Sequence, residues 1–395
     1  MAPQPRVLIV ADDLTGAMDS AGPFAALGIE TWVVAMPMRC DPASLQSARV
    51  VSVNTDTRHL PAAQAAARVG GIVQHLGSGG FDIIVKKIDS TLRGNVAAET
   101  MALLDVSGRR EAVVAAAFPA QGRTVRGGVV HVDGKPLAQT AFSKDALSPP
   151  PLAPLREVFA AARSGLRVTA AAPSDAFDSG ADIWIADSEV DADLTRIVET
   201  FASRISRVLM VGSAGLTRAL ASVFFGGHPA PAAPRHVTGT IVFAVGSRAA
   251  RSAEQVEALA AEPDTRVLRA PNGRLRRAEI PAALNLVLKA TADDAGHEGD
   301  AESVAADMAK HAIEIVRSAQ AQALVATGGD TAIAILAASD NPALQVLGDL
   351  MPGIPYARIR LAGESLWLVT KAGGFGGRDI FRDVARRLRG EFATD

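Results

Sequence analysis

The chain has 395 residues, of which 48% are hydrophobic and 21% charged, which suits about two or three folded domains and argues against wholesale disorder. Forty basic residues against 42 acidic ones give a net charge of −2. This balance leaves no broad cationic field for nucleic acid or for an anionic membrane, so any anion has to be bound locally. The single cysteine, Cys40, excludes a disulfide framework and a cysteine-based metal site.

The amino-terminal region carries an apolar run only from Val7 to Ala11, which is too short for the core of a signal peptide. No later segment has the roughly 18 uninterrupted apolar residues that a membrane-spanning helix needs. We therefore expect a cytoplasmic protein. Aromatic residues make up only 4% of the chain, which leaves few stacking surfaces for single-stranded nucleic acid.

One pattern recurs along the chain: a short β-branched run, then a polar or glycine turn, then an alanine-rich helical stretch. In the first part of the chain the predicted strands are 6–11, 49–53, 81–85, 112–117, 183–186 and 207–211. Continuous apolar strands that alternate with helices predict a parallel sheet covered on both faces. Ligands of such sheets bind beyond the carboxyl ends of the strands, where these polar turns are expected.

A proline-rich stretch over residues 228–238 can form neither a regular helix nor a central strand, so it predicts a linker between two domains. After it the pattern restarts, with predicted strands at 240–245, 323–326 and 366–369. A second proline-rich segment, 148–154, is interpreted as an internal loop because strands of the same type follow it. The expected fold class is α/β, with two domains that each contain a largely parallel sheet flanked by helices.

Two carboxylates, Asp12 and Asp13, follow the first predicted strand. Carboxylates at the end of a buried strand cost free energy unless they bind a hydroxyl, a metal or a cation. A single aspartate there would be explained as the cap of the helix that begins near Thr15. For the pair we expect one cap and one carboxylate that faces a ligand.

The densest polar cluster is Lys-Lys-Ile-Asp-Ser-Thr-Leu-Arg-Gly-Asn at residues 86–95. One interpretation is purely structural: Lys86 is a solvated strand end, and the acidic and hydroxyl side chains cap the following helix. The same residue types also suit recognition of a polyhydroxy carboxylate, because lysine and arginine bind the carboxylate while aspartate and serine bind hydroxyls. Arg58, which follows the second predicted strand, can add a bidentate contact to the same anion. Their convergence at one sheet edge favours a binding site.

The carboxy-terminal half has glycine turns where the first half has charged ones. Thr-Gly-Gly-Asp-Thr at 327–331 lies between a strand and a predicted helix, so its N–H groups can face a phosphate at the positive helix end. Residues 371–377 form a second glycine loop, with a lysine, and Gly246-Ser247 a third. Each alone is explained as an ordinary tight turn, but three after strands in one domain indicate a nucleotide site.

Several familiar motifs are absent from the sequence. It contains no P-loop, no strand-linked G-x-G-x-x-G, no H-E-x-x-H and no G-x-S-x-G. Dinucleotide-dependent oxidoreductases, zinc peptidases and α/β-hydrolases therefore lose support. The seven histidines are scattered without neighbours that suggest a zinc site, and metal ligands stay unassigned.

Together these motifs resemble those of the four-carbon acid sugar kinase family, whose members phosphorylate D-threonate, D-erythronate or 3-oxo-tetronates. In order along nearly the whole chain, the matching segments are 11–17, 86–95, 118–124, 212–216, 327–331 and 371–377. The first two segments are specific, whereas the glycine segments alone would not be. The form of residues 86–93 is similar to the threonate and erythronate branch.

The resemblance implies a sugar-acid-binding domain over residues 1–230, a nucleotide-binding domain over 239–395 and an active site in the cleft between them. It implies substrate contacts at Asp12, Arg58, Lys87, Ile88, Asp89 and Ser90, to which the charge of the 86–95 cluster adds Arg93. It implies nucleotide contacts at Ser247, Gly328, Gly329, Asp330, Thr331, Gly373 and Gly374, to which the charge of the second glycine loop adds Lys371.

The implied reaction uses ATP and Mg²⁺ to phosphorylate the terminal hydroxyl of a small sugar acid, with Asp12 or Asp13 as the base. The expected partner is that small molecule, with neither nucleic acid nor membrane, and a homo-oligomer stays open. The sequence departs from the family pattern at Arg248-Ala249 (usually Cys-Ser), at Asp330 (usually glutamate) and at 372–374 (usually Ser-Gly-Asn).

Two alternatives remain beside this interpretation. One is a kinase for a 3-oxo-tetronate or for another small hydroxy acid such as glycerate. The other is a non-catalytic sugar-acid-binding protein, which would leave the three glycine loops without a purpose.

Overall fold

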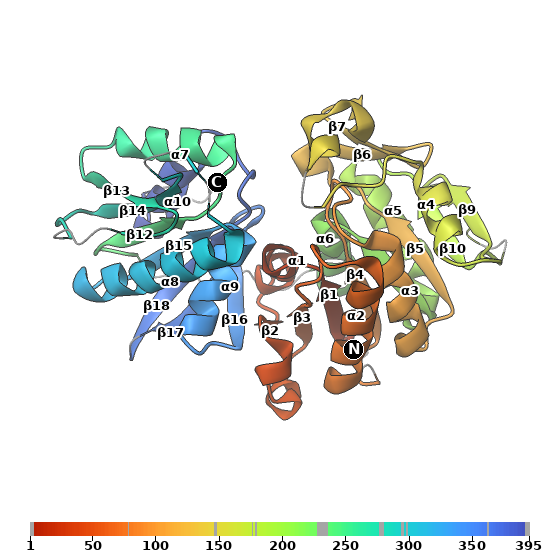
Figure 1. Cartoon of the computed structure of the whole chain (residues 1–395). Coiled ribbons are helices and arrows are strands. Elements are labelled where there is room, and N and C mark those ends of the chain that lie inside the picture. The colour runs from red at the N-terminus through yellow and green to blue at the C-terminus, as the bar shows by residue number, and fades with distance from the viewer. Residues whose placement is uncertain are drawn as a thin grey trace. The chain divides into compact units, whose positions relative to one another are not determined.

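The computed structural model of the chain describes residues 4–77, 79–145, 148–175, 177, 180–226, 236–275, 280–293, 296–297, 299–361 and 363–391. The chain divides into two compact units, Met1–Ala230 and Pro231–Asp395, whose elements are labelled in Figure 1. The predicted linker, 228–238, lies outside the described residues except for its last three positions.

The first unit is built on a sheet in which all neighbouring strands run parallel, in the order β2-β3-β1-β4-β11-β5-β10-β9. The strands are β1 (Val7–Ala11), β2 (Thr31–Val34), β3 (Val50–Asn54), β4 (Ile83–Lys87), β5 (Glu111–Ala115), β9 (Val168–Ala171), β10 (Ile183–Ala186) and β11 (Val208–Gly212). Every residue of β1, β3, β4 and β11 is buried, which explains the continuous apolar sequences of β1 and β11 and the apolar start of β4.

Helices cover both faces of this sheet. They are α1 (Leu14–Ala25), α2 (Ala62–Leu76), α3 (Val96–Ser107), α4 (Leu155–Ala162), α5 (Asp191–Phe201) and α6 (Ala214–Phe225). Helix α6 packs against α1 and α5 in one layer, and α3 packs against α2 and α4 in another. In the first layer the rings of Phe24 and Phe225 meet edge to face, with centroids 5.6 Å apart.

The second unit has a sheet in the order β13-β14-β12-β15-β18-β17-β16, parallel from β13 to β18 and antiparallel at β17 and β16. Its elements are β12 (Ile241–Val245), α7 (Ala250–Ala260), β13 (Thr265–Pro271), β14 (Asn285–Thr291), α8 (Ala301–Ser318), β15 (Ala323–Thr327), α9 (Gly329–Ala338), β16 (Ala343–Met351), β17 (Ile354–Leu361), β18 (Glu364–Lys371) and α10 (Ile380–Arg389). Helix α7 packs against α10 and α8 against α9, and Phe243 and Phe381 meet in the core with ring centroids 5.5 Å apart.

The predicted fold class is confirmed, and each predicted strand overlaps an observed one. The pattern missed β2, β9, β13, β14, β16 and β17, as well as a small antiparallel sheet of β6 (Arg123–Arg126), β7 (Val129–Val132) and β8 (Lys135–Pro136). Several of these strands are short, and others carry exposed positions that interrupt the apolar run. In β17, for example, exposed and buried residues alternate towards its end.

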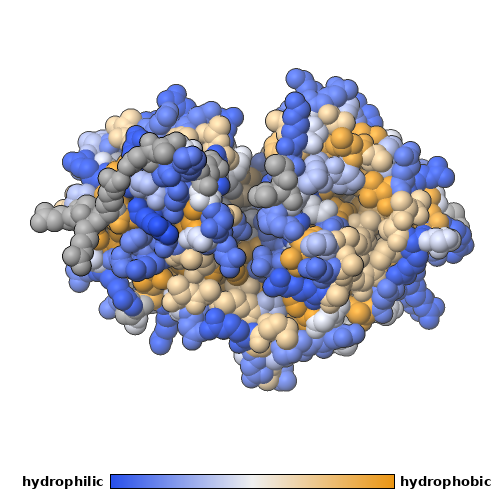
Figure 2. All heavy atoms as spheres, viewed as in Figure 1, coloured by the Kyte–Doolittle hydropathy of each residue, from blue (hydrophilic) through white to orange (hydrophobic). Residues whose placement is uncertain are grey.

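The face of the molecule seen in Figure 2 carries hydrophilic side chains with apolar patches between them. The exposed large apolar side chains among the described residues are Met38, Leu152, Val190 and Leu284. Among the helices that the structure describes, none combines the length and the apolar character needed to cross a membrane. Apolar residues are instead gathered in the two cores.

A buried ion pair joins the end of β4 to helix α3. Lys86 is 1% exposed, and its Nζ lies 2.9 Å from Oε2 of Glu99, which is equally buried. The same ammonium donates to the carbonyls of Val10 (3.2 Å) and Lys87 (2.7 Å). The interpretation of Lys86 as a solvated strand end is therefore wrong. The residue instead connects the carboxyl ends of β1 and β4 to the helix layer.

Removing one partner of this pair should strongly destabilise the first unit. We expect Glu99→Gln to lower the free energy of unfolding by about 3–5 kcal/mol, because it leaves the Lys86 charge buried and uncompensated. The double variant Lys86→Met/Glu99→Leu should cost less than Glu99→Gln alone. Urea unfolding curves test this, and a single variant that costs under about 1 kcal/mol would contradict it.

Candidate active site

The register of the first sheet brings three polar turns to one edge. Ala11, the last residue of β1, lies beside Asn54 of β3 on one side and Lys87 of β4 on the other. Lys87 in turn lies beside Gly212 of β11. Because these neighbouring strands end together, the turns that follow β1, β3 and β4 meet at the carboxyl edge, where α/β sheets bind ligands.

Asp13 caps helix α1, as expected for one member of the pair. Its Oδ1 accepts a hydrogen bond from the N–H of Gly16 (2.9 Å), and its Oδ2 accepts one from the hydroxyl of Thr15 (2.6 Å). An N-cap aspartate satisfies a helix N–H that would otherwise lack a partner. Asp12 plays no part in this cap and is 3% exposed at the end of β1.

Arg58 binds both of these carboxylates. Its Nε and Nη2 donate to Asp12 (2.8 and 3.0 Å), while its Nη1 and Nη2 donate to Asp13 (2.8 and 2.9 Å). A guanidinium has five N–H groups, so these bonds leave it little capacity for a further anion. Burial acts to raise the pKa of Asp12, but Arg58, Lys86 and Lys87 outweigh it and hold that pKa below its ordinary value.

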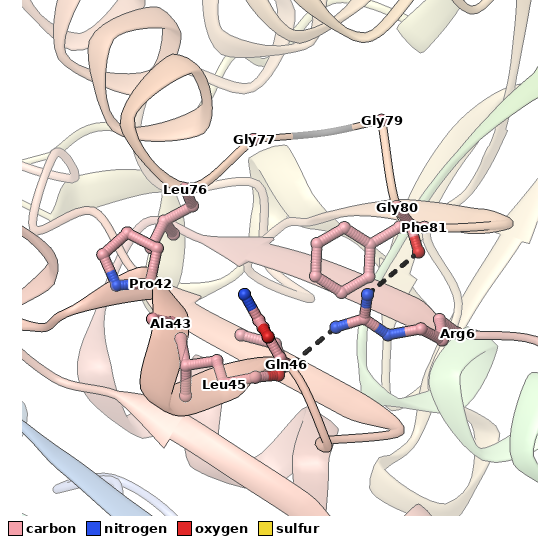
Figure 3. Close-up of a pocket in the computed structure, with 11 residues that line it drawn as sticks. Arg6, Pro42, Ala43, Leu45, Gln46, Leu76, Gly77, Gly79, Gly80 and Phe81 are labelled. Atoms are coloured by element: carbon pink, nitrogen blue, oxygen red, sulfur yellow. Dashed lines mark hydrogen bonds between the residues drawn. The ribbon is translucent and has the colours of Figure 1, made fainter.

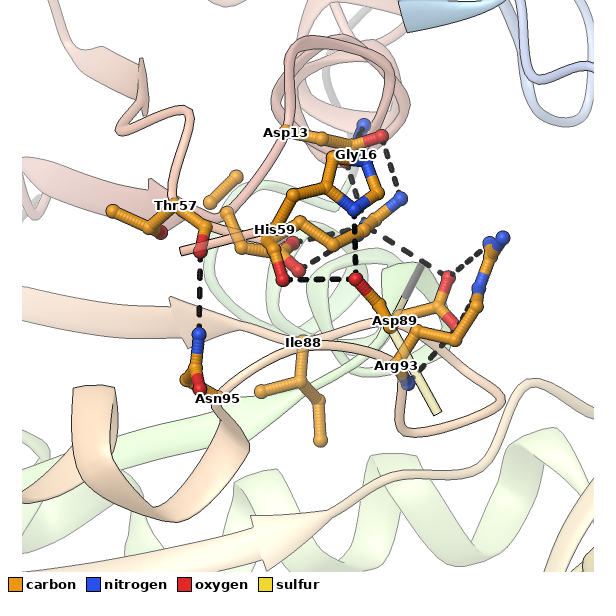
Figure 4. A network of polar contacts seen from close by, with 12 residues as sticks. Asp13, Gly16, Thr57, His59, Ile88, Asp89, Arg93 and Asn95 are labelled. Atoms are coloured by element: carbon orange, nitrogen blue, oxygen red, sulfur yellow. Dashed lines mark hydrogen bonds and ion pairs between the residues drawn. The ribbon is translucent and has the colours of Figure 1, made fainter. Parts of the chain in front are cut away.

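Asp89 and Arg93 form a second pair within the turn after β4, and Figure 4 shows their side chains facing each other. Arg93 donates from Nε (3.0 Å) and Nη2 (2.9 Å) to the two carboxylate oxygens, and Oδ2 also accepts from the N–H (3.1 Å) and hydroxyl of Thr91. The Nη2 of Arg58 lies 3.8 Å from Oδ1 of Asp89. Burial would raise the pKa of Asp89, yet Arg93 and Arg58 hold it well below its usual range.

Two further contacts fix the turn that carries Arg58. The Nδ2 of Asn95 donates to the carbonyls of Thr57 (3.3 Å) and Leu60 (2.8 Å), as Figure 4 shows for Thr57. The hydroxyl of Ser148 donates to the carbonyl of Arg58 (3.0 Å) and lies 2.7 Å from Nδ1 of His59. The loop over 148–154 therefore supports the site from outside the sheet edge.

Lys87 has hydrogen-bonding capacity to spare. It is 4% exposed, and within the described residues its Nζ makes one hydrogen bond, to the carbonyl of Ile88 (3.0 Å). Ser90 is half-buried, and its hydroxyl has no partner in the described part of the chain. Ile88 is only 2% exposed and its N–H donates to Gly212, so its side chain belongs to the core. Lys87 and Ser90 thus have donor capacity left for a ligand, as does Nη1 of Arg93, which only approaches Oδ2 of Asp145 at 3.7 Å.

The neighbouring lysines 86 and 87 point to opposite faces of the sheet. Lys86 reaches Glu99 of α3, whereas the Nζ of Lys87 would lie 3.2 Å from a Cβ added to Gly16 of α1. Side chains of successive strand residues alternate between faces, so adjacent residues of one type serve two different layers.

Asp19 is a residue of this site that the sequence interpretation missed. It lies one turn beyond Gly16 on α1, and its Oδ1 is buried without a hydrogen-bond partner among the described residues. Burial raises the pKa of Asp19 against the opposing charges of Lys87 and Arg218. The spacing of Gly16 and Asp19, three residues apart on a helix, was the available signal.

In the second unit, the carboxyl ends of β12, β15 and β18 bring the glycine turns together. Val245 lies beside Thr327, and Thr327 beside Lys371. A Cβ added to Gly373 would lie 2.2 Å from Oγ of Ser247, and one added to Gly246 would lie 2.0 Å from Oγ1 of Thr331. Glycine is therefore required where the three turns contact one another.

Helix α9 begins inside this group of turns. Gly328 precedes it with a φ of +101°, and its N–H donates to the carbonyl of Lys371 (3.0 Å). Gly329 and Thr331 lie in its first turn, and Asp330 between them is exposed. The N–H groups of a first helical turn have no partner within the helix and can face an anion.

The loop after β18 has its carbonyl groups occupied. The hydroxyl of Ser252 donates to Gly373 (2.7 Å), and Nε2 of Gln255 contacts the carbonyls of Phe375, Gly376 and Gly377 at 2.9–3.2 Å. The N–H groups of Gly373 and its neighbour Gly374 have no hydrogen-bond partner in the residues that the structure describes. Backbone amides left free in a glycine loop form a typical anion site.

Lys371 contributes to the same arrangement. It is 1% exposed, and its Nζ donates to the carbonyls of Ala372 (2.7 Å), Gly373 (3.0 Å) and Phe375 (3.1 Å). Burial lowers its pKa to about 7. All three N–H groups of the ammonium are thus taken up by the loop, so in this structure Lys371 shapes the glycine loop from within.

Groups of three or more acidic, histidine or cysteine side chains that could hold a metal ion do not occur within the described ranges. A pocket of about 420 Å³, shown in Figure 3, lies at the other edge of the first sheet and is lined mainly by apolar atoms. There the guanidinium of Arg6 donates to the carbonyls of Leu45, Ala48 and Gly80. The polar cluster at the carboxyl edge is therefore the candidate active site of this unit.

Both halves of the chain match known domain families. Residues 7–220 match the family described as a sugar-binding N-terminal domain, and residues 242–381 match the nucleotide-binding C-terminal domain. These matches define a two-part protein that pairs a sugar-binding half with a nucleotide-binding half. The chain belongs to the four-carbon acid sugar kinase family, as the resemblance predicted.

Curated relatives match over nearly the whole chain. A D-threonate kinase of Bordetella bronchiseptica is 34% identical over 406 residues, covering 98% of both chains. A D-threonate kinase of Cupriavidus necator is 34% identical and covers 93% of this chain and 94% of its own. A 3-oxo-tetronate kinase of Burkholderia multivorans is 28% identical and covers 98% of this chain and 99% of its own.

Solved structures share the fold. A Salmonella typhimurium protein described as a tRNA synthase has a TM-score of 0.76 over 96% of this chain and 99% of its own, at 19% identity, which shows the fold alone. A Bordetella bronchiseptica protein that is 32% identical, solved with citrate as a domain-swapped dimer, has a TM-score of 0.51 over 98% of this chain and 99% of its own.

Replacing Gly94 should disturb the Arg58–Asp12 contact. Its φ is +87°, and an added Cβ would lie 2.9 Å from Oδ2 of Asp12 and 3.5 Å from Cα of Arg58. Gly108 is a matched control, because its φ is +69° but nothing lies within 4 Å of an added Cβ. We expect Gly108→Ala to cost about 1–2 kcal/mol of unfolding free energy and Gly94→Ala about 1–3 kcal/mol more. Equal losses in urea unfolding would contradict the close approach.

Proposed function

We propose that the protein is an ATP-dependent kinase that phosphorylates the terminal hydroxyl of a four-carbon sugar acid, with D-threonate or D-erythronate as the preferred substrate. The observation that carries the proposal is the polar edge of the first sheet, where Asp12, Asp13 and Asp89 are held by arginines while Lys87 keeps free donors. The family membership and the relatives named D-threonate kinase support it.

The acid would be bound through groups that retain hydrogen-bonding capacity. The ammonium of Lys87 provides the charge for the substrate carboxylate, with Ser90 as a neighbouring hydroxyl donor. Arg58 contributes mainly by holding Asp12 and Asp13 in place, since four of its hydrogen bonds already go to them. The carboxylate oxygens of these aspartates that face the ligand accept hydrogen bonds from its hydroxyls.

The nucleotide would bind at the glycine turns of the second unit. Free N–H groups of Gly373 and Gly374 and the first turn of α9 suit phosphate oxygens. Ser247 lies between these turns. Mg²⁺ would arrive with ATP, because it is commonly held by phosphates, waters and one or two carboxylates, and it would neutralise phosphate charge. Asp330, in the first turn of α9, is an exposed carboxylate at this edge.

The proposed chemical step uses both the acid and the nucleotide. The terminal hydroxyl oxygen of the acid forms a bond to the γ-phosphorus while the bond from that phosphorus to the β–γ bridging oxygen breaks, which gives a phosphate monoester and ADP. The hydroxyl proton passes to a carboxylate, for which Asp12 is the first candidate and Asp13 the second. A carboxylate of low pKa is sufficient, since phosphoryl transfer depends mainly on positioning and charge neutralisation.

A panel of acids tests the function directly. We expect ADP formation in a coupled assay with D-threonate or D-erythronate, and kcat/KM lower by about 10-fold or more for three-carbon and six-carbon acids, because mispaired hydroxyls leave buried polar groups unsatisfied. A 3-oxo-tetronate in the same panel tests the other branch of the family. Binding of a tetronate without any ATP turnover would instead favour the non-catalytic binding protein.

Two isosteric variants separate the roles of the aspartates. We expect Asp12→Asn to lower kcat by about 100-fold or more while the dissociation constant for ATP stays nearly unchanged, because the acceptor for the hydroxyl proton is lost. Asp13→Asn should keep more activity, since asparagine is also a good helix cap. Steady-state kinetics and nucleotide titrations measure both effects. Full turnover in both variants would reject the assignment.

A further inference from the structure

Lys289 lies at the nucleotide edge of the second unit on a strand that the sequence interpretation missed. It is in β14, beside Val245 in the parallel register with β12. Two residues beyond Val245, the carbonyl of Ser247 accepts a hydrogen bond of 2.6 Å from the Nζ of Lys289. The lysine therefore reaches the turn that contacts both glycine loops.

The ammonium of Lys289 has no acidic partner among the described residues. It makes one hydrogen bond there, to a neutral carbonyl, and none of the ion pairs in the described chain involves it. Burial lowers the pKa of this lysine, and no carboxylate among the described residues opposes the shift. A partly buried cation without a counter-ion costs free energy that a bound anion recovers.

The place of Lys289 relative to the glycine turns suits a phosphate. A Cβ added to Gly328 would lie 3.6 Å from the backbone nitrogen of Ser247, the hydrogen-bond partner of Lys289. A Cβ added to Gly373 would lie 2.2 Å from the hydroxyl oxygen of Ser247. One turn thus contacts the start of α9, the loop after β18 and the ammonium of Lys289. Amide donors and one cation that converge in this way form a typical phosphate site.

Lys371, unlike Lys289, has no N–H group left for a phosphate. Its three N–H groups are all used by carbonyls of its own loop, so it cannot bind a phosphate without releasing that loop. Lys289 keeps two N–H groups free of partners in the described residues. The two lysines therefore have different roles, one structural and one available to a ligand.

We propose that Lys289 is the cation of the nucleotide site and binds a phosphate oxygen of the nucleotide, while Lys371 holds the glycine loop in shape. This inference rests on the proposed use of ATP and names the residue that provides the charge. It predicts that Lys289 contributes to affinity through the phosphates and not through the base or ribose.

The test compares Lys289→Met with the wild-type protein in calorimetric titrations with ATP, ADP, AMP and adenosine, in the presence of Mg²⁺. We expect ATP affinity to fall by about 10- to 100-fold, the value of a charge-assisted hydrogen bond, and adenosine affinity to change by less than about threefold. Lys289→Arg should recover part of the loss because it keeps the charge. Lys310→Met, on the exposed face of α8, is the matched control and should leave all four affinities unchanged.

Stability gives a second readout that distinguishes a ligand-binding lysine from a structural one. Without nucleotide, the melting temperature of Lys289→Met should equal or exceed that of the wild type, because an unpaired, partly buried charge is removed. The rise in melting temperature on adding ATP should shrink. A variant that melts well below the wild type without nucleotide would assign Lys289 a structural role and overturn the proposal.

The remaining outcomes separate this inference from the proposed function. If the wild-type protein binds ATP and Lys289→Met binds it equally well, the role of Lys289 is rejected while the kinase function stands. Equal losses for adenosine and ATP would also reject it, since the effect would not depend on phosphate. If the wild-type protein binds no ATP under any condition that supports its folding, the proposed function itself fails.

Discussion

The polar cluster at the carboxyl edge of the first sheet, which is the proposed acid site, depends on the contact of one guanidinium with two carboxylates. Arg58 joins the turn after β3 to the turn after β1, and four charge-assisted hydrogen bonds fix Asp12 and Asp13 relative to it. Because these opposite charges pair with one another, the side chains are fixed in place before a ligand binds. Other donors near them keep hydrogen-bonding capacity for that ligand. The donors that remain for an anion are few, and they come from the neighbouring turn after β4.

The sites proposed in the two units would bind their anions with different chemistry. The first contains charged side chains that fix one another, which would give a small polyhydroxy acid several distinct contacts in fixed directions. The second uses backbone N–H groups, made available because Ser252, Gln255 and Lys371 occupy the loop carbonyls. Phosphate oxygens are chemically alike, so a set of amides with one cation is enough to hold them.

The sequence predicted those features that depend on local pattern. The buried strand β1 was found because both of its faces are apolar, and β4 was found from its apolar start. The cap at Asp13 follows from its place before a helix. The sequence interpretation did not identify β14, because Asn285 and Lys289 limit the apolar run there to Leu286–Leu288, and the role of Lys289 was missed with the strand. The roles of Lys86 and Lys371 were also beyond it. Whether a lysine at a strand end faces solvent, a buried glutamate or three carbonyls depends on elements distant in sequence.

The opposed directions of Lys86 and Lys87 have a consequence for how this segment can vary over evolutionary time. Lys86 contacts Glu99 of α3, whereas Lys87 lies near Gly16 of α1, so both placements depend on the alternation of side chains between the two faces of the strand. A one-residue deletion or insertion within β4 would exchange the two faces and leave each layer with the wrong partner. Length changes in this part of the chain should therefore be confined to the loops before Ile83, while the strand itself keeps a constant length.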